Sequence, residues 1–400
     1  MEQTSLIHPD DTWVLWTFLI VWAAFSIYSE QRFKLAAKLS GPVVALIGGL
    51  AFANFGIIPL QSTVYDAVWD YIVPLCIPLL LLKADIRKIW RETGRLLGAF
   101  HVSALGTIVG GFAAALMLKS VISYVPEITG IMTASYIGGA MNFLAAVKIF
   151  NAPESTTNAL IVADNLVMVV HIIAMLALPG VAWAVSSFGT LPDEELYDNN
   201  NASAEHDAAH YWRPKPISLV DIGKNLALAF VIVTVSTKLS SVILGTSLPE
   251  TLRNFLGNKY LLFTSVTVVF VLLFPRFSAR LEGTQEMGTF AIYLFFVLIG
   301  IPASIKAILL EAPILFVFCG IMVLFNVLVT FGLGKLLGYK LPEMILVSIA
   351  NTAGPMNSAG IAIAKKWSKL ILPSFLVGIW GYVIGTYLGV ITGEMLRIIF

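Results

Sequence analysis

Twelve apolar runs constrain this chain more than any other feature of its sequence. Each is long enough to cross, or nearly cross, the hydrocarbon core of a bilayer. With 58% hydrophobic and only 12% charged residues, against about a quarter charged in soluble domains, the chain is predicted to be an all-α polytopic protein that lies in a lipid bilayer. The runs fall at about 13–29, 42–59, 67–82, 96–118, 128–150, 157–186, 218–244, 259–274, 288–303, 312–337, 343–364 and 369–393.

Two of these runs are interrupted by the same small-residue motif. The segment Gly138-Gly139-Ala140-Met141-Asn142 matches Ala353-Gly354-Pro355-Met356-Asn357 at an offset of 215 (139 to 354). A second match, between Lys83–Ile89 and Pro302–Ile308, has nearly the same offset, 219 (83 to 302). Two matches at nearly one offset predict that the chain is built from two repeats.

Gly-Gly and Gly-Pro pairs are unusual in the middle of a membrane helix. They remove side-chain packing and, at Pro355, a backbone donor. An unsatisfied backbone group is costly in lipid, so such a break is stable only where it faces protein or a wet cavity. Breaks at matching places in two repeats indicate the binding site of a secondary transporter. The alternative is that both segments are close-packing faces of a helix bundle.

Asp164 is the most informative charge in the sequence, because it lies some seven residues inside an apolar run. A carboxylate at that depth is costly and indicates a proton carrier or a cation ligand. Asn165 follows it directly, and His171 lies seven residues on, which places His171 on the same helix face. The alternative for Asp164 is hydrogen bonding to backbone at a helix break, and His171 alone is typical of a packed histidine.

Asn142 and Asn357 follow the two breaks directly. Amide oxygens can bind a hard cation together with freed carbonyls, whereas the alternative is that each Asn caps its own following half-helix. We therefore expect ion coupling through Asn142, Asp164, Asn165 and Asn357. The residues expected to contact a solute lie at the breaks: Ser135, Tyr136, Gly138, Gly139, Asn142, Asn351, Thr352, Gly354, Asn357 and Ser358.

The loop charges predict an orientation. The basic segment Lys83–Arg95 is expected in the cytoplasm, which places the N-terminus outside the cytoplasm. On a count of twelve crossings, the acidic segment 187–217 is then an extracytoplasmic linker. Six crossings per half would make the repeats parallel, so inverted repeats require that one of the runs does not cross the membrane.

Other chemistries find no support in the sequence. A net charge of +1 gives no reason to expect nucleic-acid binding. Cys76 and Cys319 lie inside apolar runs and form neither a disulfide framework nor a metal cluster. There is no phosphate-binding loop, zinc helix or nucleophile elbow. We expect no catalytic residues, no cofactor, and no metal other than sodium as a coupling ion.

The segments Ser135–Phe150, Ala163–His171 and Ser348–Ala364 resemble the family catalogued as Domain of Unknown Function 819, integral membrane proteins of bacteria and plastids. That family is similar in turn to bile-acid/sodium symporters, 2-hydroxycarboxylate and glutamate symporters, and sodium/proton antiporters. The resemblance implies inverted repeats, a panel domain that dimerises, and a core domain in which two discontinuous helices cross at Gly138–Asn142 and Ala353–Asn357. Asp164-Asn165 stands where antiporters keep an Asn-Asp or Asp-Asp pair, with the order reversed. The residue that matches Asp164 in the second repeat is Ile379.

The sequence thus predicts panel helices in 1–95 and 218–303, core helices in 96–186 and 304–400, and the linker 187–217 between them. The expected function is transport of a small anionic or zwitterionic organic solute across the bacterial inner membrane, by a homodimer coupled to a cation gradient. Neutral oxygen donors at the breaks favour sodium over the proton. The alternatives are a sodium/proton antiporter and, from another class, a membrane-embedded enzyme that uses Asp164 and His171.

Overall fold

The described part of the chain is entirely helical in the computed structural model, which describes residues 5–33, 41–192, 196, 216–301 and 305–400. Eight helices are long and apolar enough to cross a membrane, and four shorter apolar helices accompany them. This confirms the prediction of an all-α polytopic membrane protein. The match at Pro302–Ile308 lies partly outside the described residues.

The helices of the first half are α1 (Thr12–Arg32), α3 (Gly41–Asn54), α4 (Thr63–Ala67), the π-helix η1 (Val68–Ile72), α5 (Val73–Leu81), α6 (Ile86–Glu92), α7 (Arg95–Leu118), α8 (Val125–Phe150), α9 (Glu154–Ala177), the 3-10 helix η2 (Leu178–Gly180) and α10 (Ala182–Phe188). Those of the second half are α13 (Leu219–Leu244), α14 (Glu250–Leu256), α15 (Lys259–Leu273), α16 (Pro275–Ser278), α17 (Thr284–Gly300), α18 (Ile305–Leu336), α19 (Leu341–Thr352), α20 (Gly354–Ala364) and α21 (Ser368–Ile399).

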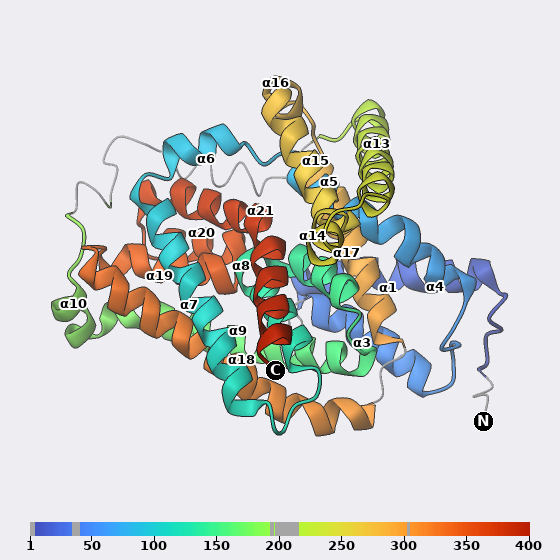
Figure 1. Cartoon of the computed structure of the whole chain (residues 1–400), viewed down its shortest axis with the longest axis horizontal. Helices are drawn as coiled ribbons and strands as arrows, with labels where there is room; N and C mark the ends of the chain where they lie inside the picture. The colour runs from blue at the N-terminus through green and yellow to red at the C-terminus, as the bar shows by residue number, and fades with distance from the viewer. Residues whose placement is uncertain (1–4, 34–40, 193–195, 197–215, 302–304) are drawn as a thin grey trace.

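The long helices pack in two groups, which lie on the right and the left of Figure 1. The first group contains α1, α3, α5, α13, α15 and α17, and the second contains α7, α8, α9, α18, α19, α20 and α21. Helices of the first group come from 12–81 and 219–300, and those of the second from 95–177 and 305–399. The names panel and core describe functions, so they stay predictions for these two groups.

Contacts between loops define two faces of the molecule. On the face that carries α6, at the top of Figure 1, Lys83 Nζ lies 2.8 Å from Glu282 Oε2 and Arg87 donates to the Leu272 carbonyl at 3.2 Å. We call this the α6 face. On the opposite face, Arg397 near the C-terminus pairs with Glu127 at 3.0 Å. We call this the C-terminal face.

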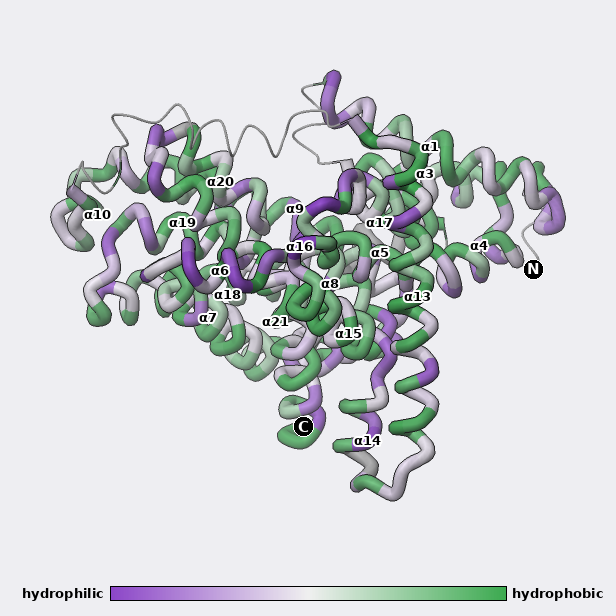
Figure 2. The backbone as a smooth tube through the Cα atoms, turned by 90° about the horizontal axis from the view of Figure 1, so that it is seen from above, coloured by the Kyte–Doolittle hydropathy of each residue, from purple (hydrophilic) through white to green (hydrophobic). Residues whose placement is uncertain are grey.

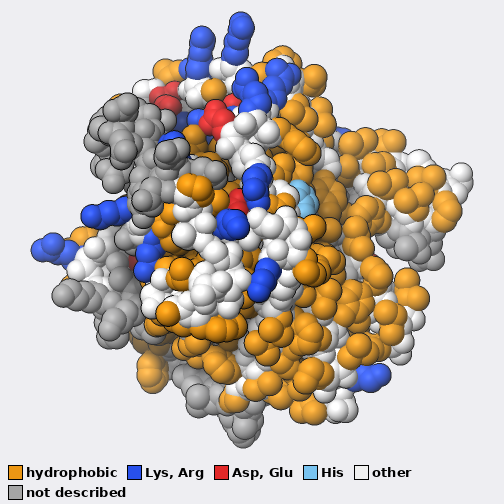
Figure 3. All heavy atoms as spheres, turned by 90° about the vertical axis from the view of Figure 1, so that its left-hand side faces the viewer, with side chains coloured by type: hydrophobic (Ala, Val, Ile, Leu, Met, Phe, Trp, Pro, Cys, Tyr) orange, Lys and Arg blue, Asp and Glu red, His pale blue; other side chains and the backbone are white. Residues whose placement is uncertain are grey.

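The surface agrees with a membrane setting. Viewed from the α6 face, α6 and α16 are largely hydrophilic, whereas most of the other helices are hydrophobic (Figure 2). Lys and Arg side chains gather at the α6 face in Figure 3, and hydrophobic side chains cover much of the surface below it. Large side chains such as Val231 and Val242 of α13 point outward, where lipid is available to cover them.

The run of α8 does not cross from one face to the other. The Phe150 ring at its end lies against Gly130 near its start, although a continuous helix would separate these residues by about 30 Å. The chain reverses at Gly139, whose φ of 69° and ψ of −169° are accessible essentially only to glycine. Residues 125–150 therefore form a re-entrant helical hairpin that opens on the C-terminal face, which we call hairpin 1.

The second broken run is also a hairpin. Ser358 Oγ of α20 donates to the Leu346 carbonyl of α19 at 2.8 Å, whereas twelve residues of continuous helix would separate them by about 18 Å. The chain reverses at Gly354, with a φ of 82°. We call residues 341–364 hairpin 2. It opens on the α6 face, because Arg95 at the start of α7 donates to the Gly338 carbonyl just before it, at 2.8 Å.

These hairpins change the predicted topology. The two helix breaks lie at the predicted motifs, and the discontinuous segments turn back, so these two of the twelve candidate runs form hairpins. The helices that run between the faces are α1, α3, α4–α5, α7 and α9 in the first half and α13, α15, α17, α18 and α21 in the second. If all ten of these segments cross the membrane, each half has five crossings and one hairpin, which is the parity that inverted repeats require.

Matched helices of the two halves run in opposite directions. The helix α5 ends at the α6 face beside Glu282, where its counterpart α17 begins. The helix α7 begins beside Gly338, where its counterpart α18 ends. This antiparallel order is what an inverted repeat predicts.

The described residues on either side of the polar segment 187–217 lie near the α6 face. The Gly189 carbonyl accepts from Leu341 N at 3.1 Å, at the base of hairpin 2 on the α6 face. At the other end, Asn225 donates to the Glu282 carbonyl on that same face, at 2.6 Å. The described ends of 187–217 thus share one face with the basic segment. Which face is cytoplasmic stays a prediction.

Candidate functional site

The tips of the two hairpins meet on one helix, α21. Pro355 at the tip of hairpin 2 lies against Gly378, where an added Cβ would come within 2.7 Å of the Pro355 nitrogen. Gly138 at the tip of hairpin 1 lies against Gly385, where an added Cβ would come within 2.7 Å of the Gly138 Cα. Gly381, between them, lies against the Ile137 carbonyl. Both tips are therefore within two turns of α21, at its middle.

Asn142 fixes hairpin 1 to α21. Its Nδ2 donates to the carbonyls of Gly138 at 2.5 Å and Tyr382 at 3.2 Å. Its Oδ1 accepts from Thr386 N at 2.8 Å and from the Thr386 hydroxyl. Tyr382 and Thr386 are one helical turn apart, so the amide holds the α21 backbone itself. All four bonds that an amide side chain can make are used, and Asn142 is fully buried.

Asn357 has the same local bond but different surroundings. Its Nδ2 donates to the Ala353 carbonyl at 2.7 Å, as Asn142 donates to Gly138, yet the side chain is exposed. Gly354 has no atom within 4 Å of an added Cβ, in contrast to Gly139, which faces Tyr382 at 3.2 Å. Hairpin 1 is thus docked at its tip, whereas the matching positions of hairpin 2 are open. The predicted equivalence of the two Asn residues holds locally and fails in their packing.

Most of the other predicted polar residues bond within the hairpins. Thr352 Oγ1 donates to the Ser348 carbonyl at 2.9 Å, and Ser358 closes hairpin 2 through Leu346. Asn351 Nδ2 donates to the Phe100 carbonyl of α7 at 3.3 Å, and the buried Oδ1 of Asn351 has no hydrogen-bond partner. Asn165 donates to the Ile161 carbonyl of its own helix at 2.8 Å. Ser135 is buried on the first arm of hairpin 1.

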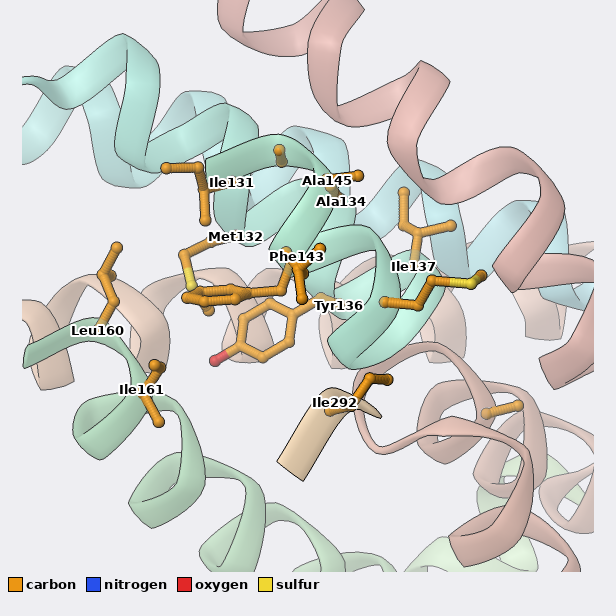
Figure 4. Close-up of a cluster of buried hydrophobic side chains, with 14 of the residues drawn as sticks. Ile131, Met132, Ala134, Tyr136, Ile137, Phe143, Ala145, Leu160, Ile161 and Ile292 are labelled. Carbon is orange, nitrogen blue, oxygen red and sulfur yellow. The ribbon is translucent and has the colours of Figure 1, made fainter. Parts of the chain in front are cut away.

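Asp164 lies against hairpin 1. Its carboxyl is beside the Tyr136 hydroxyl, which also adjoins the Cys319 thiol of α18. Neither Asp164 Oδ1 nor the Tyr136 hydroxyl has a hydrogen bond of good geometry, although both atoms are buried. Figure 4 shows the Tyr136 ring directed from hairpin 1 toward α9, where Leu160 and Ile161 lie. The structure therefore brings the predicted Asp164 and Tyr136 together, and keeps both away from Asn142.

His171 belongs to a separate buried network. Its Nε2 lies 3.1 Å from Ser348 Oγ of hairpin 2, which donates to Asn326 Oδ1 at 2.7 Å. Because Ser348 uses its one hydrogen there, His171 Nε2 carries a proton and donates it. Asn326 Nδ2 in turn lies 2.9 Å from Ser103 Oγ and 3.0 Å from Thr107 Oγ1, both of α7.

This network joins α9, α18, α7 and hairpin 2, and sequence reasoning missed all of it except His171. An Asn in the middle of the run 312–337 was the available signal. The predicted pairing of His171 with Asp164 is not formed, since Nε2 of His171 is bonded to Ser348.

The bases of both hairpins are held by Arg–Glu pairs, which the sequence reading also missed. Each hairpin begins with Pro-Glu, at Glu127 and Glu343, an offset of 216 (127 to 343). Glu127 pairs with Arg397 at 3.0 Å, and Glu343 pairs with Arg95 at 3.5 Å. This third match extends the repeat signal. It also indicates that the hairpins are anchored at their bases, away from the tips.

Removing one such anchor should destabilise hairpin 2. Glu343 is 2% exposed, so Arg95→Leu removes a cation that faces a buried carboxylate and should cost about 1–3 kcal/mol. The matched control is Lys88→Leu, whose partner Glu92 is half-exposed in an i,i+4 pair; it should cost less than about 1 kcal/mol. Thermal denaturation of the purified variants measures both, and equal shifts would contradict the anchoring role.

The comparisons with known proteins agree with this picture at the level of family. The profile of the family described as "Protein of unknown function (DUF819)" matches residues 17–399. The chain is 43% identical over 390 residues to the "Uncharacterized membrane protein YjcL" of Bacillus subtilis (strain 168), covering 98% of each chain.

Proposed function

We propose that this chain, which belongs to the DUF819 family of membrane proteins, is a secondary active transporter that moves a small organic solute by alternating access. One observation carries the proposal: two helical hairpins enter from opposite faces, and their tips meet on α21. A bundle that needed glycines only for close packing would not require reversals of the chain inside the membrane. Matched helices that run in opposite directions support an inverted repeat, the usual basis of alternating access.

A cavity between the two groups of helices supports the choice of solute. It has a volume of about 340 Å³ and extends from Lys83, Asp85 and Lys88 at the α6 face to Ile379 of α21. Ile379 is the neighbour of Gly378, which contacts the tip of hairpin 2. Charges of both signs lie at this entrance, because Lys83 pairs with Glu282 and Asp85 lines the same cavity as Lys88. Such a mixture suits a zwitterionic solute. We propose the first group as the panel and the second as the moving core.

The test is solute uptake driven by defined gradients. Purified protein is first screened by thermal shift against organic acids, amino acids and small peptides, with and without sodium. Solutes that stabilise it are then offered to proteoliposomes under a sodium gradient at fixed pH, or under a pH gradient without sodium. We expect uptake under the sodium gradient. If solutes stabilise the protein but none of them is taken up under either gradient, this result contradicts transport.

Sodium/proton antiport is the second candidate, and the unpaired carboxyl of Asp164 is the observation that favours it. Proteoliposomes without solute distinguish the two functions. An antiporter changes the luminal pH when a sodium gradient is imposed, whereas a sodium-coupled symporter needs the solute. For the enzyme alternative, His171 Nε2 is bonded to Ser348, and no hydrogen bond between His171 and Asp164 is present among the described residues.

We also propose that the protein is a homodimer joined through the first group. This proposal follows from the resemblance to transporters that dimerise through a panel domain. The helix α13 exposes Val231 (57%) and Val242 (66%) on its outer side, where either lipid or a second copy can cover them. In a Cys76→Ala, Cys319→Ala background, cysteine at Val231 should form a disulfide cross-link between copies in membranes. The control is cysteine at Val170 of α9, equally exposed at 61% but in the second group. Cross-links through Val170→Cys alone would contradict this assignment.

A further inference from the structure

We infer that Asp164, Tyr136 and Thr133 form a binding site for one sodium ion between hairpin 1, α9 and α18. Only the role of this sodium as the coupling ion rests on the proposed function. The site itself is argued from buried oxygen atoms. The sequence analysis assigned Tyr136 to the solute and the ion to Asn142, Asp164, Asn165 and Asn357. What is new is that Tyr136 and Thr133 join Asp164 as ion ligands, at a place away from Asn357.

Three oxygen atoms on these elements have no hydrogen bond of good geometry, although the Tyr136 hydroxyl adjoins the Asp164 carboxyl. They are Asp164 Oδ1, the Tyr136 hydroxyl and the Thr133 hydroxyl, and all three atoms are buried. Tyr136 and Thr133 are 1% and 0% exposed. A buried oxygen that is wholly unpaired costs about 1–3 kcal/mol, so these three atoms call for an explanation, and a bound cation supplies one.

The three groups lie on adjoining elements. Tyr136 adjoins both the Asp164 carboxyl of α9 and the Cys319 thiol of α18. Thr133 is one turn before Tyr136 on hairpin 1, and a Cβ added at Gly111 would lie 3.2 Å from its hydroxyl and 3.4 Å from Met322. Met322 is in turn one helical turn after Cys319 on α18. Thr133 and Tyr136 thus face the same side of the bundle.

The chemistry of these groups selects a monovalent hard cation. A carboxylate and two hydroxyls are oxygen ligands, which hard cations prefer. Asp164 is the one charged ligand among them, and it makes no ion pair with a described Lys or Arg. A single positive charge therefore gives a neutral buried site, whereas a divalent ion would leave a net charge in the membrane interior. A proton would occupy one oxygen and leave the Thr133 hydroxyl unpaired.

The position of the site links the ion to the hairpin tip. Tyr136 is three residues before Gly139, where hairpin 1 reverses. Asp164 as a residue is only partly buried, whereas its Oδ1 atom is buried. An ion held by Tyr136 and Asp164 joins the first arm of hairpin 1 to α9, whereas Asn142 joins the second arm to α21.

The test is equilibrium binding of radioactive sodium to the purified protein, with choline replacing sodium at constant ionic strength. We expect one saturable site per chain. Asp164→Asn should abolish binding, and Tyr136→Phe and Thr133→Val should each weaken it about tenfold or more. Thr129→Val is the matched control: Thr129 is also fully buried and one turn earlier, but its hydroxyl already donates to the Val125 carbonyl at 2.7 Å. It should bind sodium as the wild type does.

A second measurement reports sodium at the site through the neighbouring Cys319 thiol. In a Cys76→Ala background, sodium should slow the alkylation of Cys319 by a maleimide, and Tyr136→Phe should remove this protection. Equal effects of Thr133→Val and Thr129→Val, or a binding reaction that responds to pH and not to sodium, would overturn the site. Sodium binding without any solute uptake would overturn the proposed function and leave the sodium site unaffected. Solute uptake, together with wild-type sodium binding in Tyr136→Phe, would overturn the sodium site and leave the proposed function unaffected.

Discussion

Asn142→Ala is expected to abolish solute uptake and to lower the free energy of unfolding by about 2–4 kcal/mol. The substitution removes four hydrogen bonds, and it leaves the Thr386 hydroxyl and a carbonyl of hairpin 1 without partners in a buried place. The tip of hairpin 1 then loses its attachment to α21. Thermal denaturation and proteoliposome uptake on the same preparation measure the two effects.

Asn357→Ala is the matched control at the equivalent position of the second repeat. Asn357 is exposed and keeps one bond, to a carbonyl in its own hairpin. Its removal should change stability by less than about 1 kcal/mol. If Asn357 contacts the solute, uptake falls while stability is kept. Equal destabilisation by both substitutions would show that hairpin 2 is docked as tightly as hairpin 1, against the difference described above.

The two Asn residues also show where sequence reasoning ends. The motif around each is nearly the same, so the local structure could be predicted: a break at glycine, followed by an Asn that bonds four residues back. What differs is the partner helix. Asn142 reaches Tyr382 and Thr386, which lie 240 and 244 residues away along the chain. No local pattern reports a contact of that range.

The same limit explains the error in the topology. A Gly-Gly or Gly-Pro motif predicts that a helix stops, but it does not predict whether the chain then continues in the same direction or reverses. Reversal depends on contacts such as Phe150 with Gly130 and Ser358 with Leu346. The parity conflict, in which twelve crossings disagreed with inverted repeats, was the one signal in the sequence. The runs 128–150 and 343–364 are long enough for two short arms as well as for one crossing.

The candidate site also contains one residue that the sequence could predict and others that it could not. Asp164 could be predicted, because a carboxylate inside an apolar run is costly whatever surrounds it. Its neighbour Tyr136 could be named only as a residue near a break, since phenol groups are common in membrane helices. The pairing of the two requires that hairpin 1 fold back against α9. Cys319 of α18, which adjoins them, carried no signal beyond being a cysteine in an apolar run.

Gly385→Ala is expected to abolish uptake, because one added methyl group would separate hairpin 1 from α21. Its Cβ would lie 2.7 Å from the Gly138 Cα and 3.0 Å from the Ala134 carbonyl. Both are backbone atoms, which cannot move aside as a flexible side chain can. Overpacking of this kind costs about 1–3 kcal/mol, and the displaced hairpin would also strain the bonds of Asn142 to Thr386.

The control is a glycine-to-alanine substitution that we expect to raise the stability instead of lowering it. Gly320→Ala places the same methyl group inside α18, where no atom lies within 4 Å. Alanine is the better helix former by roughly 0.5–1 kcal/mol, so this variant should melt at a higher temperature than the wild type while Gly385→Ala melts at a lower one. If both variants gain stability and both transport, hairpin 1 does not depend on close contact with α21. The tips would then meet without α21 as their common support, and the glycines of that helix would be ordinary packing residues.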